Sequence, residues 1–415
     1  MKTVGIYQSG RLGQNSSDNS YSMAKIAEIL SENCRVEIVH HEENLDAEAW
    51  QKWLGVNLSR VDFRYVPALE MEQGSANFRK SLREEADFGR EISEPYEIFW
   101  GFGNCPPIFC HSKMGIYWTE FPSMSFDEFY GHDLPEWGQM GYLSRFFGVR
   151  RHRVSWRGRL ASYQHILCPS RFTKQWCWRK WQVTPTVFPQ VLRPGFTVGE
   201  KTHSIMTYGE FSAEKHERQE VLIGIFQDFY EQKIAKLGLD SEWKLIVAGT
   251  CGESEADMAF VEKLRRKAYG YPIEFLVNPG LETVQKLLGE ATFFWSALGY
   301  ESSEELYPER MDACGMRVLE AQAAGAIPMV YQAGAMPEVV RHAMNGLLWC
   351  TARELVDMFC AVLLENRLLP IIATGAVKNA EIYQDTAFRQ NLRNRLRGMV
   401  EISDVPGTEE GEKSE

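Results

Sequence analysis

The sequence predicts an α/β protein with two successive Rossmann-like domains, each built on a parallel sheet. The chain has 415 residues, which is too many for one ordinary hydrophobic core. Short β-rich runs alternate with segments of helical periodicity, and this alternation is typical of right-handed βαβ units. A proline-containing stretch near residues 190–200 separates the first alternating series from the second.

The first domain is predicted over residues 1–192. It opens with a strand (TVGIY), a polar loop (QSGRLGQNSSDNS), a helix (YSMAKIAEILSEN) and a second strand (RVEIVHH). Gly10 and Gly13 lie in the polar loop, where the lack of a Cβ would let backbone amides approach a ligand. A simple flexible loop explains these glycines equally well, and the GxGxxG fingerprint of dinucleotide-binding proteins is absent.

The second domain is predicted over residues 193–384. Strands are expected at HSIMTYGEF, WKLIVAGTC, IEFLVN, ATFFWSAL and IPMVY, with helices between them. Residues 385–405 are predicted to form a helix, and the charged residues 406–415 a disordered tail. Ligands of such sheets bind beyond the carboxyl ends of the strands, so a cleft between the domains is the expected site.

Composition excludes several classes of protein. The net charge of −11 argues against a surface devoted to nucleic acid or anionic membrane. Neither a run of about 18 apolar residues nor a signal peptide is visible. The nine cysteines show no CxxC spacing, which predicts reduced thiols and no zinc site. The expected location is the cytoplasm, with peripheral membrane association left open.

The stretch MDACGMRVLEAQAAGAIP (residues 311–328) carries two acids around a glycine. Gly315 is expected to open a helix whose first N–H groups would bind a diphosphate. Glu320 could accept hydrogen bonds from ribose hydroxyls, and Asp312 could reach sugar hydroxyls. Asp312 is alternatively an N-cap, and Glu320 a solvated side chain, although its apolar neighbours suggest burial and a buried acid needs a partner. Glu338 is expected at the same edge of the cleft.

The block GMRVLEAQAAGAIPMVYQAGAMPEVVRHAMNGLLW resembles the signature of glycosyltransferase family 4, the retaining nucleotide-sugar enzymes of GT-B fold. The resemblance extends through YGEFSAEKHERQEVLIGIF and GIYWTEFP and covers nearly the whole chain. It implies two Rossmann-like domains that face a central cleft, with the final helix returning to the N-terminal domain. It also implies metal-independent transfer of a hexose-type sugar, without a cofactor, from a UDP- or GDP-linked donor. The acceptor would be a hydroxyl of a glycan, of a lipid-linked molecule or of another compound.

The resemblance also assigns roles to individual residues. Glu320 would bind the nucleotide ribose, and Asp312 would lie near the donor sugar. The amides of Gly315, Met316 and Arg317 would meet the diphosphate. The loop at residues 209–218 would contribute Gly209, and its cations Lys215 or Arg218 would neutralise the leaving phosphate. Glu120 stands at a position where the family often has His.

Two departures from the family pattern concern the diphosphate. Glu210 replaces an expected arginine, and Glu217 lies at the position of the usual lysine. A carboxylate that faces a diphosphate is repulsive. These residues predict either an altered donor site or a protein that has lost catalysis and acts as a binding or partner subunit.

Residues 145–159 hold six arginines among aromatic residues. They could form a basic face for an anionic lipid, a phosphorylated acceptor or nucleic acid, and the last option would make the protein a nucleic-acid-modifying glycosyltransferase. A solvated segment that pairs with the acidic remainder is the alternative. Ser170 is predicted to cap a helix that opens at Phe172 and Thr173, because a catalytic serine would need a different glycine pattern.

Overall fold

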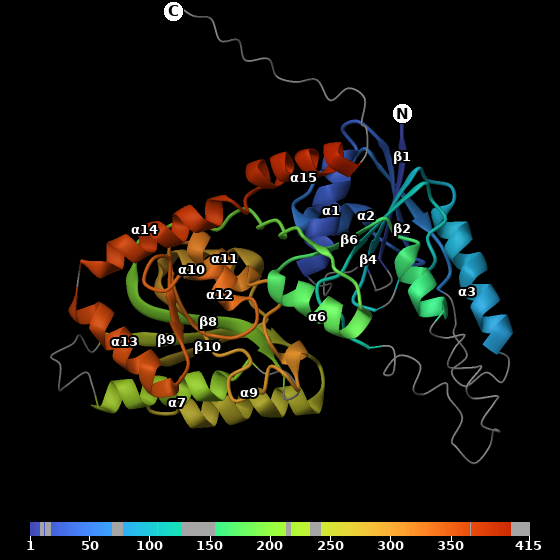
Figure 1. Cartoon of the computed structure of the whole chain (residues 1–415). Helices are drawn as coiled ribbons and strands as arrows, with labels where there is room; N and C mark the ends of the chain where they lie inside the picture. Colours follow the sequence, from blue (N-terminus) through green and yellow to red (C-terminus); the bar gives the residue numbers. More distant parts are fainter. Residues whose placement is uncertain are drawn as a thin grey trace, which may run out of the picture.

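The computed structural model describes residues 1–8, 12, 18–68, 78–105, 107–125, 154–212, 217–232, 242–365 and 367–399. It contains one parallel sheet of seven strands and another of six, each flanked by helices (Figure 1). The predicted fold class of two Rossmann-like domains with parallel sheets is therefore confirmed. The predicted boundary at residues 192 and 193 falls between the last strand of the first sheet and the first strand of the second.

The first sheet has the strand order β3-β2-β1-β4-β5-β6-β7. The order reverses between β1 and β4, so the ligand crevice is expected beyond the carboxyl ends of these two strands. Every strand pair in this sheet is parallel. The strands are β1 (Thr3–Gln8), β2 (Arg35–His40), β3 (Val61–Tyr65), β4 (Ile98–Phe102), β5 (Met114–Trp118), β6 (His165–Cys168) and β7 (Thr186–Val187). Its helices are α1 (Asp18–Leu30), α2 (Ala47–Leu54), α3 (Phe78–Ser93), residues 154–161, and α6 (Arg171–Trp181).

The second sheet repeats this arrangement with the order β10-β9-β8-β11-β12-β13. Its reversal lies between β8 and β11. The strands are β8 (Thr202–Phe211), β9 (Lys244–Cys251), β10 (Ile273–Val277), β11 (Ala291–Ser296), β12 (Ile327–Tyr331) and β13 (Leu347–Trp349). The helices are α7 (Gln219–Gln232), α9 (Glu255–Ala268), α10 (Leu281–Glu290), α11 (Met316–Ala323), α12 (Met336–Val339), α13 (Ala352–Leu364) and α14 (Leu368–Glu381).

The central strands are buried on both faces, which explains their continuous apolar sequences. All five residues of β4 are buried, and its Trp100 stacks on Phe102 with ring centroids 6.0 Å apart. In the second domain, Trp295 of β11 packs edge-on against Phe359 of α13 at 5.2 Å. These aromatic cores hold the sheets rigidly, so that the loops at the strand ends can carry the functional groups.

The last described helix, α15 (Asp385–Met399), packs against the first domain although it follows the second in sequence. Figure 1 shows α14 and α15 running from one domain to the other along the same side of the molecule. Phe388, Leu392 and Leu396 of α15 are buried in the core of the first domain, and the Phe388 ring lies 5.4 Å from that of Phe188. Residues 400–415 lie outside the described part of the chain.

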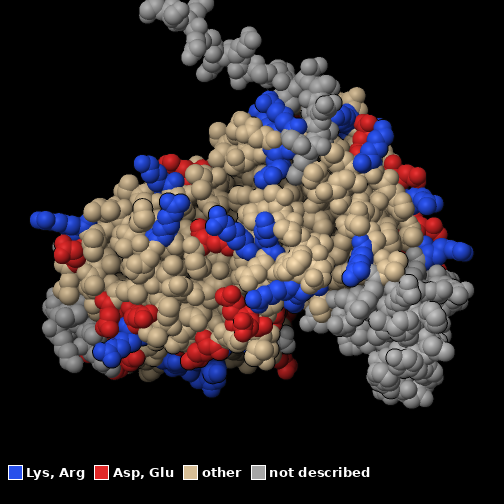
Figure 2. Space-filling model, viewed as in Figure 1, with Lys and Arg blue, Asp and Glu red and all other residues tan. Residues whose placement is uncertain are grey.

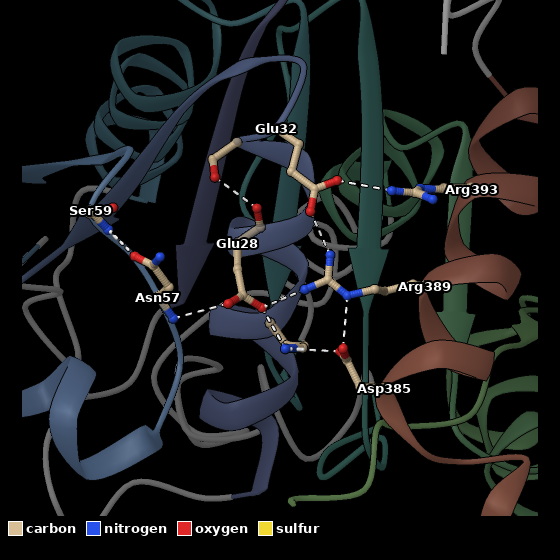
Figure 3. Close-up of polar contacts among 9 residues, drawn as sticks. Glu28, Glu32, Asn57, Ser59, Asp385, Arg389 and Arg393 are labelled. Atoms are coloured by element: carbon tan, nitrogen blue, oxygen red, sulfur yellow. Dashed lines mark hydrogen bonds and ion pairs between the residues drawn. The ribbon is translucent and has the colours of Figure 1, made fainter. Parts of the chain in front are cut away.

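A cluster of ion pairs fixes α15 on α1 (Figure 3). Arg389 contacts three carboxylates: Glu28 at 3.1 Å, Glu32 at 2.6 Å and Asp385 at 2.8 Å. Lys25 of α1 also contacts Asp385 at 2.9 Å. Burial alone would raise the pKa of Asp385, but hydrogen bonds and positive charge from Lys25 and Arg389 hold this pKa below its ordinary value of 3.8.

Replacing Arg389 with glutamine is expected to lower the free energy of unfolding by about 1 to 2 kcal/mol, because three charge-assisted contacts are lost at a partly exposed site. The loss should shrink in 1 M salt. A carboxyl group whose pKa is lowered by folding stabilises above its ordinary pKa and loses this contribution as the pH falls through the folded-state value. The difference between the two proteins should therefore also shrink in acid, below about pH 4.

Thermal unfolding at several salt concentrations and pH values measures this effect. Arg393→Gln is the matched control, because Arg393 lies one turn further along α15 and makes an ion pair with Glu32 at 3.0 Å from a more exposed position. The control should lose less stability. If the Arg389→Gln protein and the unmodified protein unfold at the same temperature at low salt, the cluster does not stabilise the docking of α15.

Candidate active site

The helix predicted after Gly315 is present as α11. Gly315 is its N-cap residue and has a φ of 74°, a conformation that glycine adopts readily. A Cβ at this position would also lie 2.8 Å from Val339 Cγ2. The Leu319 N–H donates the first helical bond to the Gly315 carbonyl at 3.0 Å. The N–H groups of Met316 and Arg317 therefore lie in the first turn, at the positive end of the helix dipole.

Asp312 caps the turn that leads into α11. Its Oδ1 accepts hydrogen bonds from the Cys314 N–H at 3.0 Å and the Gly315 N–H at 2.6 Å. The N-cap interpretation of Asp312 is therefore wrong, because Gly315 is the N-cap residue of α11 and Asp312 holds the turn that precedes the helix. The Gly315 N–H, which the resemblance assigns to a diphosphate, donates to this carboxylate instead, and that assignment needs correction. Met316 and Arg317 keep their assigned positions at the start of the helix.

Glu320 lies one turn into α11 and is only 6% exposed. The alternative of a solvated side chain is therefore wrong. A buried carboxylate is costly without partners, and Glu320 has an interaction partner in the structure. On α11, Glu320 lies about one helical turn after Met316.

Glu217 forms an ion pair with the side chain of Arg317. Arg317 Nη1 lies 2.7 Å from Glu217 Oε1 and donates a second bond to the Tyr208 carbonyl at 3.0 Å. The carboxylate at position 217 is therefore paired with a cation, and its effect on donor binding stays a prediction. Gly209 makes room for the pair, because a Cβ there would lie 2.6 Å from Arg317 Nη1 and 2.8 Å from Glu217 Cδ.

Arg218 is used to hold the loop between β11 and α11. Its Nε donates to the Tyr300 carbonyl at 2.9 Å, and its Nη1 lies 3.6 Å from Glu220. This arrangement differs from the expected contact with a leaving phosphate, because the guanidinium is directed to a backbone carbonyl. Glu210 is exposed. Gly10, Gly13 and Lys215 lie outside the described residues.

Glu120 and Ser170 follow neighbouring strands of the first sheet, and Ser170 contacts the second domain. Glu120 follows β5; its N–H donates to Asn104 Oδ1 at 3.1 Å, and its carbonyl accepts from Thr173 Oγ1 at 2.8 Å. Ser170 accepts from the Thr173 N–H at 3.0 Å and is the N-cap of α6, as predicted. The Ser170 hydroxyl also donates to the Ala313 carbonyl at 2.7 Å, which ties α6 to the loop that carries Asp312.

Glu338 forms the second contact between the domains. Its two carboxylate oxygens accept hydrogen bonds from the N–H groups of Arg171 and Phe172, each at 2.8 Å. A carboxylate at this place also interacts favourably with the dipole of α6. We call the contacts of Ser170 and Glu338 with the opposite domain the interdomain bridge. The sequence placed Glu338 at the cleft edge but carried no signal for its partner.

The bridge is flanked by apolar packing and by a cavity. Phe121, Phe172 and Trp176 of the first domain pack with Met311, Ala333 and Ala335 of the second. A cavity of about 340 Å³ lies where the two domains meet, with a lining that includes Arg171, Gln190, Met316, Glu338, Arg341 and Tyr383. The domains therefore face one another across a space next to the start of α11.

The arginine-rich segment at residues 145–159 is only partly described, from residue 154 onward. Arg157 is exposed, but Arg159 is buried, forms an ion pair with Glu85 and lies over the Phe109 ring at 5.6 Å. Burial lowers the pKa of Arg159 to about 10. Arg159 is thus a structural residue, and its inclusion in a basic face is wrong. On the face shown in Figure 2, basic side chains lie among acidic ones.

Among the described residues, no group of three or more His, Cys, Asp or Glu side chains could hold a metal ion. No described helix is long and apolar enough to cross a bilayer.

Two Rossmann-like domains that meet next to the start of α11 have the architecture of the GT-B fold. More specifically, residues 193–360 match the model of the family Glycosyl transferases group 1. The chain thus carries a group 1 glycosyltransferase domain and is an enzyme of this class. No curated protein sequence matches the chain significantly.

Solved structures with the same architecture align over nearly the whole chain. HepE of Anabaena, solved with UDP-glucose, is 10% identical with a TM-score of 0.62, over 96% of this chain and 100% of that one. A glycosyltransferase from Rickettsia africae is 12% identical with a TM-score of 0.64, over 97% and 99%. WaaG, which is involved in lipopolysaccharide biosynthesis, is 14% identical with a TM-score of 0.57, over 95% and 100%. At these identities the similarity establishes the fold.

Proposed function

We propose that the protein is a retaining glycosyltransferase that moves a hexose-type sugar from a nucleoside-diphosphate sugar to an acceptor hydroxyl, without a metal ion. The observation that carries the proposal is α11, which has the N–H groups of Met316 and Arg317 in its first turn, the buried Glu320 one turn later and the carboxylate of Asp312 in the turn before it. Such a helix terminus favours anions. The UDP-glucose bound to HepE supports a nucleotide-sugar donor.

In this proposal the donor lies mainly on the second domain. Glu320 accepts hydrogen bonds from the ribose, and the N–H groups of Met316 and Arg317 stabilise the diphosphate. Asp312 lies near the sugar hydroxyls. Glu120 approaches from the first domain, which receives the acceptor: a glycan, a lipid-linked molecule or another hydroxyl compound.

The reaction exchanges one bond for another at the anomeric carbon. The bond to the phosphate oxygen breaks with its electron pair, and the acceptor oxygen forms a new bond on the same face of the sugar. The acceptor proton passes to the leaving phosphate. No protein nucleophile is needed, so the protein contributes orientation, charge stabilisation of the phosphate and exclusion of water.

Neither alternative function gains support from the described residues. The impaired-subunit alternative rested on Glu210 and Glu217; Glu217 is paired with Arg317, and Glu210 is an exposed acid. The nucleic-acid alternative rested on the arginine-rich segment, in which Arg159 is internal.

A panel of nucleotides tests the proposed function. UDP, GDP, ADP and their sugars are compared in thermal unfolding of the full chain, with inorganic phosphate and the free nucleosides as controls. The correct nucleotide at about 100 times its dissociation constant is expected to stabilise the protein by about 2.7 kcal/mol. Unchanged unfolding with every nucleoside diphosphate would contradict the proposal.

A further inference from the structure

The ion pair between Arg317 and Glu217 lies where the proposed diphosphate site meets the second sheet. Arg317 is the second residue of α11, and its guanidinium reaches back to the Tyr208 carbonyl, near the carboxyl end of β8. This position joins two features that favour a phosphate: a helix N-terminus and the end of a parallel strand at the reversal of strand order.

Both members of the pair are partly enclosed, and the positive member is the more exposed of the two. The side chain of Arg317 is 23% exposed, whereas that of Glu217 is 12% exposed. Glu217 is therefore the more enclosed partner and serves as a support for the guanidinium. The chain at Glu217 is itself held in place, because the next residue, Arg218, is bound to the Tyr300 carbonyl.

We propose that the Arg317 side chain binds the diphosphate of the donor, and that Glu217 positions the guanidinium for this contact. The inference rests on the proposed function and adds a side-chain role to a residue whose N–H was already assigned. A planar guanidinium matches phosphate oxygens in a bidentate contact. Negative charge accumulates on the phosphate as the glycosidic bond breaks, so a fixed cation at this point also favours departure of the leaving group.

Gly209 provides the room that the ion pair needs beside β8. The two members of the pair fill the space in which a Cβ of Gly209 would lie. Because Gly209 has no side chain, the ion pair can pack directly against the backbone of β8. The family resemblance assigned Gly209 to the donor site, and the structure offers a physical reason for a glycine there: room for the ion pair.

Four variants of the full chain test the inference. Arg317→Gln removes the cation, and the double variant Glu217→Gln with Arg317→Gln removes both charges without leaving an enclosed carboxylate unpaired. The double variant Glu217→Lys with Arg317→Gln places a cation on the other side of the pair. Arg265→Gln is the matched control, since Arg265 is an exposed arginine of the same domain that pairs with Glu262 at 3.6 Å.

The nucleotide used is the one among UDP, GDP and ADP that stabilises the unmodified protein. Its dissociation constant is measured for every variant, together with that of the corresponding monophosphate. Both variants that lack a cation should bind the diphosphate at least ten-fold more weakly, with a smaller loss for the monophosphate. The Glu217→Lys double variant should recover part of this affinity, and the Arg265→Gln protein should bind normally.

The outcomes separate the two proposals. Unchanged diphosphate affinity in the folded Arg317→Gln protein, or in the neutral double variant, would overturn the role of Arg317 and leave the proposed function intact. If no nucleoside diphosphate binds the unmodified protein, the proposed function fails and this inference fails with it.

Discussion

Replacing Glu320 with glutamine is expected to reduce turnover about 100-fold and to weaken nucleotide binding at least ten-fold. The side chain keeps its shape but loses its charge, so hydrogen bonds from ribose hydroxyls change from charge-assisted to neutral. Because Glu320 is 6% exposed, solvent cannot replace the lost contact. A loss of binding with a retained thermal transition would separate this effect from unfolding.

A deoxynucleotide makes this test specific for the ribose. The unmodified protein should bind the 2′-deoxynucleoside diphosphate more weakly than the ribonucleotide, and the Glu320→Gln protein should lose part of this preference. Glu309→Gln is the control, because Glu309 is an exposed acid in the short helix before α11. An equal ribose preference in the Glu320→Gln and unmodified proteins would show that Glu320 acts elsewhere.

Replacing Glu338 with alanine is expected to lower the stability of the domain contact by about 1 to 3 kcal/mol, because two hydrogen bonds to backbone N–H groups of α6 are lost. This corresponds to a change of about 5- to 150-fold in the ratio of closed to open molecules. Turnover should fall, since an open cleft admits water and separates Glu120 from the donor site.

Small-angle scattering and turnover together measure this effect. The Glu338→Ala protein should have a larger radius of gyration than the unmodified protein, and Glu338→Gln an intermediate value. Glu381→Ala, at an exposed acid of α14, should leave both quantities unchanged. If Glu338→Ala changes neither the scattering profile nor turnover, the bridge does not control closure.

Local patterns in the sequence predicted the architecture and the start of α11. Strand and helix periodicities are set by which faces are buried, and a glycine with positive φ or a serine before a helix acts within a few residues. Gly315 and Ser170 were therefore placed correctly. The burial of Glu320 followed from its small, apolar neighbours, which form a helix packed inside the second domain.

Contacts between distant segments were not predictable in the same way. The pairing of Glu217 with Arg317 depends on how β8 and α11 are placed by the sheet, and the pairing of Glu85 with Arg159 depends on the packing of two helices. The family resemblance gave Glu217 a position that faces the diphosphate, and the charge pattern gave Arg159 a surface role. Neither revealed the oppositely charged partner, because in each case the partner lies far away in sequence.

The position of α15 has a consequence for how the protein acquires its structure during synthesis. The first domain emerges from the ribosome before the second, yet its hydrophobic core includes Phe388, Leu392 and Leu396. That core cannot be completed until the second domain has been translated. Until then, the nascent first domain exposes part of its apolar surface to solvent. In this state, binding to chaperones and aggregation compete with folding.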